Sequence, residues 1–336
     1  MKNLSQPQHT AESIFALVSQ FQVIRVLFTA YELEIFTVIG ETEKNSRQIA
    51  GKILADARAT DRLLNALCAQ GFLFKRKNLF SNTPFSLRYL VKNKPGYMAG
   101  LMHQVHLWDS WTTLTNSVKK GTSVFSRPEK ENGGQSKWLD AFISAMHYRA
   151  KDSASAIAGK IDLHGVKRVL DVGGGSGVFA MAIARTAKDI SATVFDLPDV
   201  VPITQKFLRK EKMSGRINTV SGNFNKDPLP KGYDLVLLSA IIHSNSYQEN
   251  ANLIKKCAAS LHPKGQMVIQ DYVMDETRTH PVRGTLFALN MLVGTRAGDT
   301  FTETEIKEWF THAGIRLEKS IEAFNGNSLM IGRKIK

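Results

Sequence analysis

The hydrophobic positions in the second half of the chain predict short strands that alternate with helices. Apolar runs rich in β-branched residues occur at 167–173, 191–198, 217–223, 233–242 and 265–274. Segments with helical periodicity, such as 176–187 and 250–261, lie between them. This alternation is typical of a parallel, doubly wound α/β sheet.

The last two predicted strand segments, 315–326 and 327–335, form a pair. Asn325, Gly326 and Asn327 lie where these segments meet and are a strong hairpin signal. We therefore expect the parallel sheet to end in an antiparallel hairpin at one edge.

The first 95 residues predict a mainly helical domain with a small β element. Apolar residues recur at helical spacing over 14–28, which gives a long helix with one apolar face. Further helices are expected at 46–54 and 59–73, and residues 72–83 predict two short strands around a basic turn. Helices followed by a hairpin in this order indicate a winged-helix domain.

Residues 97–160 favour helices again, interrupted by a polar stretch at 126–137 that we expect to form a loop. A helix that begins near Trp138 leads into the sheet. The sequence thus predicts three regions. They are a winged-helix domain at 1–95, a helical substrate-pocket region at 96–160 and a cofactor-binding α/β domain at 161–336.

The composition is that of an ordinary globular protein, since 43% of the 336 residues are hydrophobic and 22% are charged. The net charge of +14 is spread along the chain, so it does not mark a nucleic-acid groove. Cys68 and Cys257 are far apart and predict buried thiols in a reducing compartment, with no metal site. We find no signal-peptide pattern and no run of about 18 uncharged apolar residues. A cytoplasmic protein without a membrane span is expected.

A glycine-rich loop follows the first strand of the α/β domain. Asp171 precedes Gly173, Gly175 and Gly177, and an apolar helix comes next. Glycines at this position let a nucleotide-like ligand approach the backbone. The dinucleotide fingerprint would require glycine at 178, where Val178 stands, so the spacing disfavours a nicotinamide or flavin dinucleotide.

Two acids and two apolar side chains narrow the choice of ligand. Asp171 would repel a pyrophosphate but can bind the α-ammonium group of S-adenosylmethionine, directly or through water. Asp196 ends the next strand, where a carboxylate can accept both ribose hydroxyls. Leu197 and Phe224 are placed to sandwich the adenine ring. The cofactor predicted by this pattern is S-adenosyl-L-methionine.

These motifs make the chain resemble the hydroxyindole and plant-caffeate type of O-methyltransferase over nearly its whole length. The resemblance is carried by residues 30–36, 62–73 and 81–90 for the dimerisation domain, 170–177, 195–198 and 222–224 for the cofactor motifs, and 301–314 for the penultimate helix. It implies a Rossmann-like class I methyltransferase domain, a homodimer formed through the N-terminal domain, and a small-molecule methyl acceptor.

Several positions depart from the pattern of the family it resembles. Asn223 replaces an acid that reaches the adenine amino group, although an amide oxygen can still accept a hydrogen bond. Ser239 replaces a lysine that many plant members carry near the cofactor. The catalytic His-Asp-Trp run is here His243-Ser244-Asn245, so only the histidine matches.

The resemblance makes His243 the general base, and histidine suits that role because it exchanges protons near neutral pH. Asp271 falls where the family places an acid beside this histidine and is expected to orient the imidazole. A second family acid would fall near Thr300, which cannot act as one.

Three further residues are expected to line the acceptor pocket. His106 lies among aromatic residues and shares a predicted helix face with His103. Met146 and Met291 resemble family positions that pack against an acceptor ring.

The function expected from these features is O-methylation of a small aromatic or polycyclic hydroxyl compound. Three alternatives stay open at this point. The chain could methylate carbon on a pigment-type substrate, bind cofactor without catalysis, or act as a winged-helix DNA-binding regulator through Lys75-Arg76-Lys77. The spread of positive charge along the chain disfavours the regulator.

Overall fold

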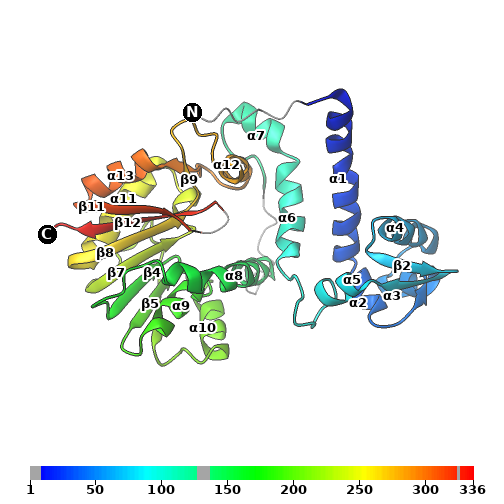
Figure 1. Ribbon diagram of the computed structural model, residues 1–336, viewed down its shortest axis with the longest axis horizontal. Coiled ribbons are helices and arrows are strands. Elements are labelled where there is room, and N and C mark those ends of the chain that lie inside the picture. The colour runs from blue at the N-terminus through cyan, green and yellow to red at the C-terminus, as the bar shows by residue number, and fades with distance from the viewer. Residues whose placement is uncertain (1–8, 127–136, 324–325) are drawn as a thin grey trace. The chain divides into compact units, whose positions relative to one another are not determined.

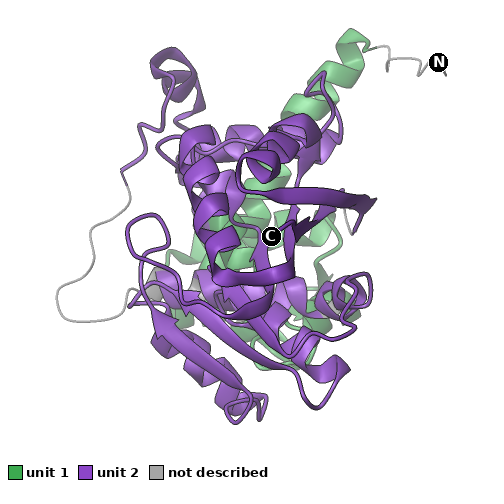
Figure 2. Ribbon diagram, turned by 90° about the vertical axis from the view of Figure 1, so that its left-hand side faces the viewer, with its two compact units in different colours: residues 1–105 green, residues 106–336 purple. Residues whose placement is uncertain are grey.

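The computed structural model describes residues 9–126, 137–323 and 326–336, and the chain forms two compact units (Figure 2). Residues 1–105 make up the first unit and residues 106–336 the second. The predicted helical linker and substrate-pocket region, 96–160, spans the boundary between these two units. Its last helix, α8 (Lys137–Ala158), contributes Ala154, Ile157 and Ala158 to the apolar core beneath the sheet, and this burial joins it to the second unit.

The N-terminal unit has the predicted helix-and-hairpin arrangement. Its helices are α1 (Ala11–Glu32), α2 (Ile35–Ile39), α3 (Ser46–Ile53), α4 (Ala57–Ala69) and α5 (Pro84–Tyr89). Strands β1 (Lys44–Asn45), β2 (Leu73–Arg76) and β3 (Leu79–Asn82) form an antiparallel sheet in the order β1-β3-β2. Ile49, Leu64, Leu67 and Phe80 are fully buried and form the core of this unit.

Helix α1 leaves its apolar face exposed within its unit. The exposed apolar side chains are Ile14, Phe15, Leu17, Val18, Phe21 and Ile24. Only the C-terminal end of the helix is covered, where Phe28, Ala30 and Tyr31 are buried. Among the described residues, α1 is the one helix that is long and apolar enough to cross a membrane by length and composition alone. The search for about 18 uncharged apolar residues in a row did not find this helix, because Arg25 interrupts its apolar sequence.

The second unit is built on a seven-stranded sheet with the order β11-β12-β8-β7-β4-β5-β6 (Figure 1). The parallel strands are β4 (Arg168–Val172), β5 (Ser191–Asp196), β6 (Ile217–Ser221), β7 (Tyr233–Ser239) and β8 (Leu261–Asp271). At the β8 edge, β12 (Ser328–Lys334) pairs antiparallel with both β8 and β11 (Ile315–Glu322). The predicted parallel sheet with a final antiparallel hairpin is confirmed. In the hairpin turn, Gly326 has a φ of 81°, whereas Asn325 lies outside the described residues.

Helices cover both faces of this sheet (Figure 1). On β7, Leu235 and Leu237 join the core shared with α8 and α9 (Val178–Thr186), while Val236 and Leu238 join the core shared with α11 (Tyr247–Ser260) and α13 (Glu303–His312). Successive side chains of a strand point to opposite faces, so a strand covered on both sides is apolar throughout. This explains the unbroken apolar runs in the sequence.

The second unit contains several further helices and short strands. They are α6 (Leu101–Trp111, which begins in the first unit), α7 (Leu114–Lys120), α10 (Val201–Lys210), the 3₁₀ turn η1 (Ile242–Ser244), β9 (Val273–Met274), α12 (Val282–Gly294) and β10 (Phe301–Thr302). Cys257 on α11 is buried and Cys68 on α4 is only half-buried; both are free thiols. The prediction that both thiols are buried is thus wrong for Cys68, because α4 faces solvent on one side.

Candidate active site

The glycine loop after β4 packs too closely for side chains. A Cβ atom on Gly173 would lie 2.3 Å from Cδ1 of Ile241, and one on Gly174 would lie 2.6 Å from Oδ2 of Asp171. Gly173, Gly175 and Gly177 also have positive φ angles of 69°, 57° and 75°. These positions therefore require glycine, and the loop presents its backbone to any ligand at this edge of the sheet.

The carboxyl group of Asp171 is fully buried under this loop, and neither of its oxygens has a hydrogen-bond partner of ordinary geometry. Burial raises the pKa of Asp171 to about 7; the nearby Asp196 adds to the rise, and the backbone N–H of Ala180 opposes it. A buried carboxylate without a partner is costly. The site therefore fits a ligand that brings a cationic group to the loop, as the ammonium group of S-adenosylmethionine would.

Asp196 fixes the glycine loop to the end of β5. Its Oδ2 accepts from the backbone N–H of Gly175 at 2.7 Å, and its Oδ1 accepts from the backbone N–H of Leu197 at 2.7 Å. Each carboxylate oxygen keeps a further lone pair for a ribose hydroxyl. Burial raises the pKa of Asp196. Leu197 is 42% exposed beside it, which leaves its side chain free to cover a ligand.

Asn223 and Phe224 lie in the turn after β6. The side-chain oxygen of Asn223 accepts from the backbone N–H of Asn225 at 2.9 Å. The Phe224 ring lies next to the glycine loop, since a Cβ atom on Gly173 would be 3.5 Å from its Cε1. The structure thus brings Phe224 to the loop, whereas Asn223 already makes a local bond that the sequence did not reveal.

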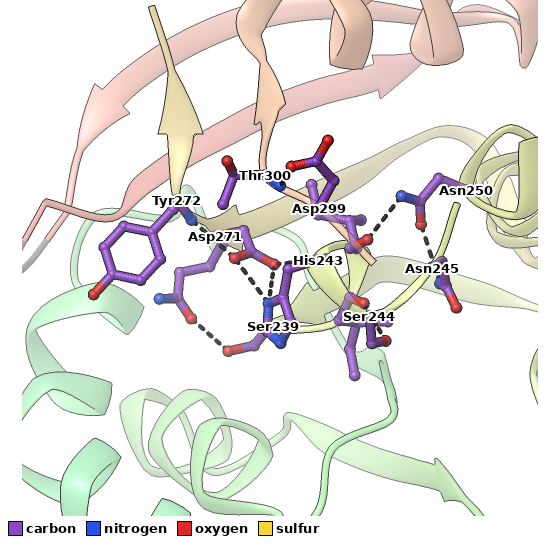
Figure 3. A network of polar contacts seen from close by, with 12 residues as sticks. Ser239, His243, Ser244, Asn245, Asn250, Asp271, Tyr272, Asp299 and Thr300 are labelled. Carbon is purple, nitrogen blue, oxygen red and sulfur yellow. Dashed lines mark hydrogen bonds and ion pairs between the residues drawn. The ribbon is translucent and has the colours of Figure 1, made fainter. Parts of the chain in front are cut away.

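Ser239 ends β7 and its side chain is turned to a neighbouring strand. Its hydroxyl donates to Oε1 of Gln270 on β8 at 2.5 Å (Figure 3). The hydroxyl oxygen can still accept a hydrogen bond, but its proton is engaged by Gln270.

His243 and Asp271 meet at the ends of β7 and β8 (Figure 3). Nδ1 of His243 lies 3.0 Å from Oδ1 and 2.9 Å from Oδ2 of Asp271, and Asp271 also accepts from the backbone N–H of Tyr272 at 2.9 Å. The His243 side chain is 15% exposed and that of Asp271 only 2%. An ionised carboxylate can only accept, so Nδ1 carries a hydrogen in this contact, and in the neutral imidazole Nε2 is then the nitrogen that has the lone pair.

An aromatic ring that sequence reasoning did not single out packs on this histidine. Phe287 on α12 meets His243 edge-on with ring centroids 4.7 Å apart, and its centroid lies 4.9 Å from that of Tyr272. Phe287 precedes Met291 by one helical turn. The rule that residues four apart share a helix face could therefore have revealed it.

The other predicted acceptor residues are less closely tied to His243. Met291 is buried on α12, and Met146 on α8 and His106 on α6 are half-buried. The structure thus places Met291 on the same helix as Phe287.

His147, next to Met146, is a second residue that the sequence did not reveal. It is buried, stacks on Phe207 at a centroid distance of 4.1 Å, and places Nδ1 2.9 Å from Oγ of Ser176 in the glycine loop. Burial lowers the pKa of His147 to about 4, so the ring is neutral. A single histidine within an apolar helix carries no signal that would distinguish this contact from core packing.

No acid replaces the one that the family pattern would place near Thr300. The neighbouring Asp299 uses Oδ1 to accept from the backbone N–H of Thr300 at 2.7 Å, and in Figure 3 its carboxyl group points away from the imidazole. The backbone N–H of Asp299 donates to the carbonyl of His243 at 3.0 Å and steadies its turn. Across the ranges described by the structure, no group of three or more His, Cys, Asp or Glu residues could hold a metal ion.

Comparisons with known proteins match this architecture over most of the chain. Residues 111–316 match the model of the O-methyltransferase domain, and residues 15–92 match that of the O-methyltransferase dimerisation domain. The 3-hydroxy-5-methyl-1-naphthoate 3-O-methyltransferase of Streptomyces sahachiroi is 30% identical over 86% of this chain and 85% of its own length. The tetracenomycin polyketide synthesis 8-O-methyl transferase of Streptomyces glaucescens is 26% identical over 96% of both chains.

Solved structures share the fold. Human N-acetylserotonin methyltransferase in complex with S-adenosylmethionine superposes with a TM-score of 0.82 at 23% identity, over 99% of this chain and 100% of that one. The sheet order, the glycine loop and these matches define an S-adenosylmethionine-dependent methyltransferase with a Rossmann-like domain. More narrowly, the chain belongs to the O-methyltransferase family that carries an N-terminal dimerisation domain.

Proposed function

We propose that this protein transfers the methyl group of S-adenosylmethionine to a hydroxyl oxygen of a small aromatic or polycyclic compound, with His243 as the general base. The observation that carries the proposal is the His243–Asp271 pair, in which the carboxylate engages Nδ1 of an imidazole that packs edge-on against the Phe287 ring. Relatives named for a hydroxynaphthoate and for tetracenomycin support an acceptor of this class.

The chemistry is an in-line displacement in which this chain supplies the base. When bound, S-adenosylmethionine supplies an electrophilic methyl group on a sulfonium. The acceptor oxygen forms the new bond to carbon while the bond from sulfur to carbon breaks, and the hydroxyl proton moves to Nε2 of His243. His243 thereby becomes an imidazolium ion. Asp271 already accepts a hydrogen bond from its Nδ1–H, and the carboxylate stabilises the new positive charge on the ring.

The proton must leave during attack rather than before it. An ordinary phenol and an ordinary imidazole differ by about 3.5 pKa units, or roughly 5 kcal/mol. Complete deprotonation before attack would add that cost to the barrier. A base positioned at hydrogen-bond distance avoids the cost because the oxygen loses its proton as it gains the methyl group.

We assign cofactor binding to the residues gathered at the carboxyl ends of β4 to β7. Asp171 would interact with the ammonium group, directly or through water, and Asp196 with the ribose hydroxyls. The full set is Asp171, Gly173, Gly175, Gly177, Asp196, Leu197, Asn223, Phe224 and Ser239. The orphaned oxygens of Asp171 and the close-packed glycine loop support this assignment.

The acceptor side is assigned to aromatic and sulfur-bearing residues. Phe287 and Tyr272 form an aromatic pair next to His243, which favours an acceptor ring that can stack or meet them edge-on. His106, Met146 and Met291 complete the proposed pocket.

The exposed face of α1 is the surface that we assign to homodimer formation. It lies within the matched dimerisation domain and presents large apolar side chains, including Phe15 and Phe21 at 74% and 52% exposure. The free thiols of Cys68 and Cys257 support a location in the cytoplasm.

Replacing the proposed base tests this function. His243→Gln should lower kcat at least ~100-fold toward a hydroxylated naphthoate or a related acceptor. The affinity for S-adenosylhomocysteine, measured by titration calorimetry, should stay near that of the unmodified protein because the glycine loop is untouched. An enzyme with undiminished turnover after this change would remove His243 from the mechanism.

A further inference from the structure

A row of three asparagine side chains runs from the surface at Asn225 into the interior next to the His243 turn. Nδ2 of Asn225 donates to Oδ1 of Asn245 at 3.1 Å, and Nδ2 of Asn245 donates to Oδ1 of Asn250 at 3.1 Å. Nδ2 of Asn250 then donates to the backbone carbonyl of Ile242 at 2.8 Å (Figure 3 shows the last two of these bonds). Asn245 is 3% exposed and Asn250 fully buried, so water does not compete for the bond between them, whereas Asn225 lies at the surface.

This amide relay, made of Asn225, Asn245 and Asn250, joins two segments of different function. At one end, the backbone N–H of Asn225 donates to Oδ1 of Asn223, in the turn assigned to the adenine. At the other end, Ile242 is the residue directly before His243 and opens the turn η1. The relay therefore runs from the cofactor side of the site to the residue assigned as the base.

Both ends of the relay are tied to rigid elements. Asn250 lies in the second turn of α11, whose capping box at Ser246 and Glu249 fixes the start of the helix. Lys256, further along α11, donates to the carbonyls of Phe224 and Asp227 at 2.8 Å and 2.9 Å, which holds the turn after β6 to the same helix. Asn245 is the link between these two anchored parts.

We propose that Asn245 is a positioning residue, which sets the His243 turn relative to the turn that carries Asn223 and Phe224. The position requires a side chain that accepts one hydrogen bond and donates another, and an amide does both. In the family pattern the catalytic histidine is followed by Asp-Trp. This chain has Ser244-Asn245 there, so hydrogen bonds of Asn245 take part in positioning the histidine turn instead. The inference rests on the proposed role of His243.

The test uses an isosteric change that removes only the donor. In Asn245→Asp an ionised carboxylate can still accept from Asn225 but cannot donate to Asn250, so kcat at pH 8 should fall about 10-fold, or about 1.4 kcal/mol in the barrier. The KM values for cofactor and acceptor should change less than about 3-fold, since no binding group is removed.

The pH dependence separates positioning from simple damage. A buried carboxyl group takes up a proton readily, and its O–H can then donate to Asn250 as the amide did. The ratio of kcat for Asn245→Asp to kcat for the unmodified enzyme should therefore rise toward one as the pH falls from 8 to 5.5. Asn245→Ala should show a similar loss with no recovery, and Asn252→Asp, an exposed change on the same helix, should leave kcat unaffected at every pH.

A ratio that stays flat with pH, or a loss confined to KM, would overturn the proposal. If Asn245→Asp does not fold by circular dichroism, Asn225→Ala at the exposed end of the relay replaces it. That variant should lower kcat about 3-fold with unchanged melting temperature, and an unchanged kcat would again overturn the proposal. A failure of the proposed function gives a different result from a failure of this inference. If His243 is not the base, His243→Gln retains turnover, whatever the activity of the asparagine variants.

Discussion

The two carboxyl groups that end β4 and β8 lie in contrasting surroundings. Asp271 accepts from the ring of His243 and from the backbone of Tyr272, whereas Asp171 is buried with no partner of ordinary geometry. Asp271 thus has its hydrogen-bond partners within the protein, whereas the surroundings of Asp171 leave room for the cationic group that we propose the cofactor supplies.

The raised pKa of Asp171 makes cofactor affinity depend on pH. Without ligand, this carboxyl group takes up a proton below about pH 7, and the ligand's ammonium group favours the ionised form. Affinity for S-adenosylhomocysteine should therefore weaken as the pH falls below 7, by at most about 10-fold per unit, and level off above it. Titration calorimetry from pH 5.5 to 8.5 measures this.

Asp171→Asn provides the matched control, because it keeps the shape and removes the ionisation. The folded-state pKa lies above the unfolded value of 3.8, so the ionised group destabilises the ligand-free fold increasingly as the pH rises through that interval. The variant should melt higher than the unmodified protein at pH 8 without ligand, yet bind S-adenosylhomocysteine weakly and without the pH trend. An identical pH trend in the variant would show that another group is responsible.

The sequence predicts the positions of the candidate residues relative to the strands better than it predicts their contacts. The spacing of the glycines and the strand-end position of Asp196 follow from local rules, and the glycine loop, Asp196, His243 and Asp271 lie at or after the carboxyl ends of β4, β5, β7 and β8. The partners of Asn223 and Ser239 could not be read in advance, since Asn225 and Gln270 reach them through turn geometry and strand register. Phe287 and His147 come from helices whose pattern is also that of ordinary core packing.

At the scale of elements, side chains of helices α8 and α10 form hydrogen bonds with the glycine loop that follows β4. Nδ1 of His147 on α8 lies 2.9 Å from Oγ of Ser176, and the hydroxyl of Thr204 on α10 donates to the carbonyl of Gly175 at 2.5 Å. The loop backbone is thus fixed on both sides of Gly175 before any ligand arrives. This preorganisation lowers the entropic cost of binding.

His147→Phe removes the contact with the Ser176 hydroxyl and keeps an aromatic ring to stack on Phe207. Loss of the contact with Ser176 should weaken binding of S-adenosylhomocysteine by about 5-fold, in line with roughly 1 kcal/mol for one hydrogen bond, with little change in kcat. Calorimetry and steady-state kinetics measure the two effects.

The same variant should also change how the free energy of unfolding depends on pH. The folded-state pKa of His147 is lowered from 6.5 to about 4, so its contribution to the free energy of unfolding is fully present above pH 6.5 and is lost as the pH falls toward 4. His147→Phe should lack this part of the acid destabilisation in urea titrations at pH 7 and pH 4.5. Unchanged affinity together with an unchanged pH trend would mean that α8 does not support the loop.

Elements were the most predictable level of this molecule. The inner strands β4 and β7 coincide with apolar runs in the sequence, because both of their faces are buried, whereas β6 and β11 at the two edges of the sheet carry exposed polar residues. The division into units was harder to foresee. The predicted boundary at residue 95 precedes the observed one at 105, and α8 belongs with the sheet through side chains such as Ile157 whose partners are distant in sequence.

At the scale of the whole molecule, we expect the exposed apolar face of α1 to be buried by a binding partner. The helix passes the length and composition test for a membrane span, yet it lies within the matched dimerisation domain and its C-terminal end is buried in that domain. A second copy of the chain is the partner that accounts for these observations together.

Charges placed on this face should separate the two copies. Phe15→Glu with Phe21→Glu should shift the protein from twice the 37.4 kDa of one chain to a single chain in analytical ultracentrifugation. Leu54→Glu, at a side chain 94% exposed elsewhere in the same unit, introduces one such charge away from this face and should leave the dimer intact. A monomeric unmodified protein, or one that sediments with lipid vesicles, would contradict the assignment of this face.

The destination of the methyl group is the most direct test of the account. The enzyme is incubated with S-adenosylmethionine labelled with deuterium in its methyl group and with a hydroxylated naphthoate, and the product is located by mass spectrometry and NMR. The account predicts one labelled methyl on oxygen, formed by the unmodified enzyme and nearly absent with His243→Gln. A labelled methyl on carbon, or equal product from both proteins, would contradict it.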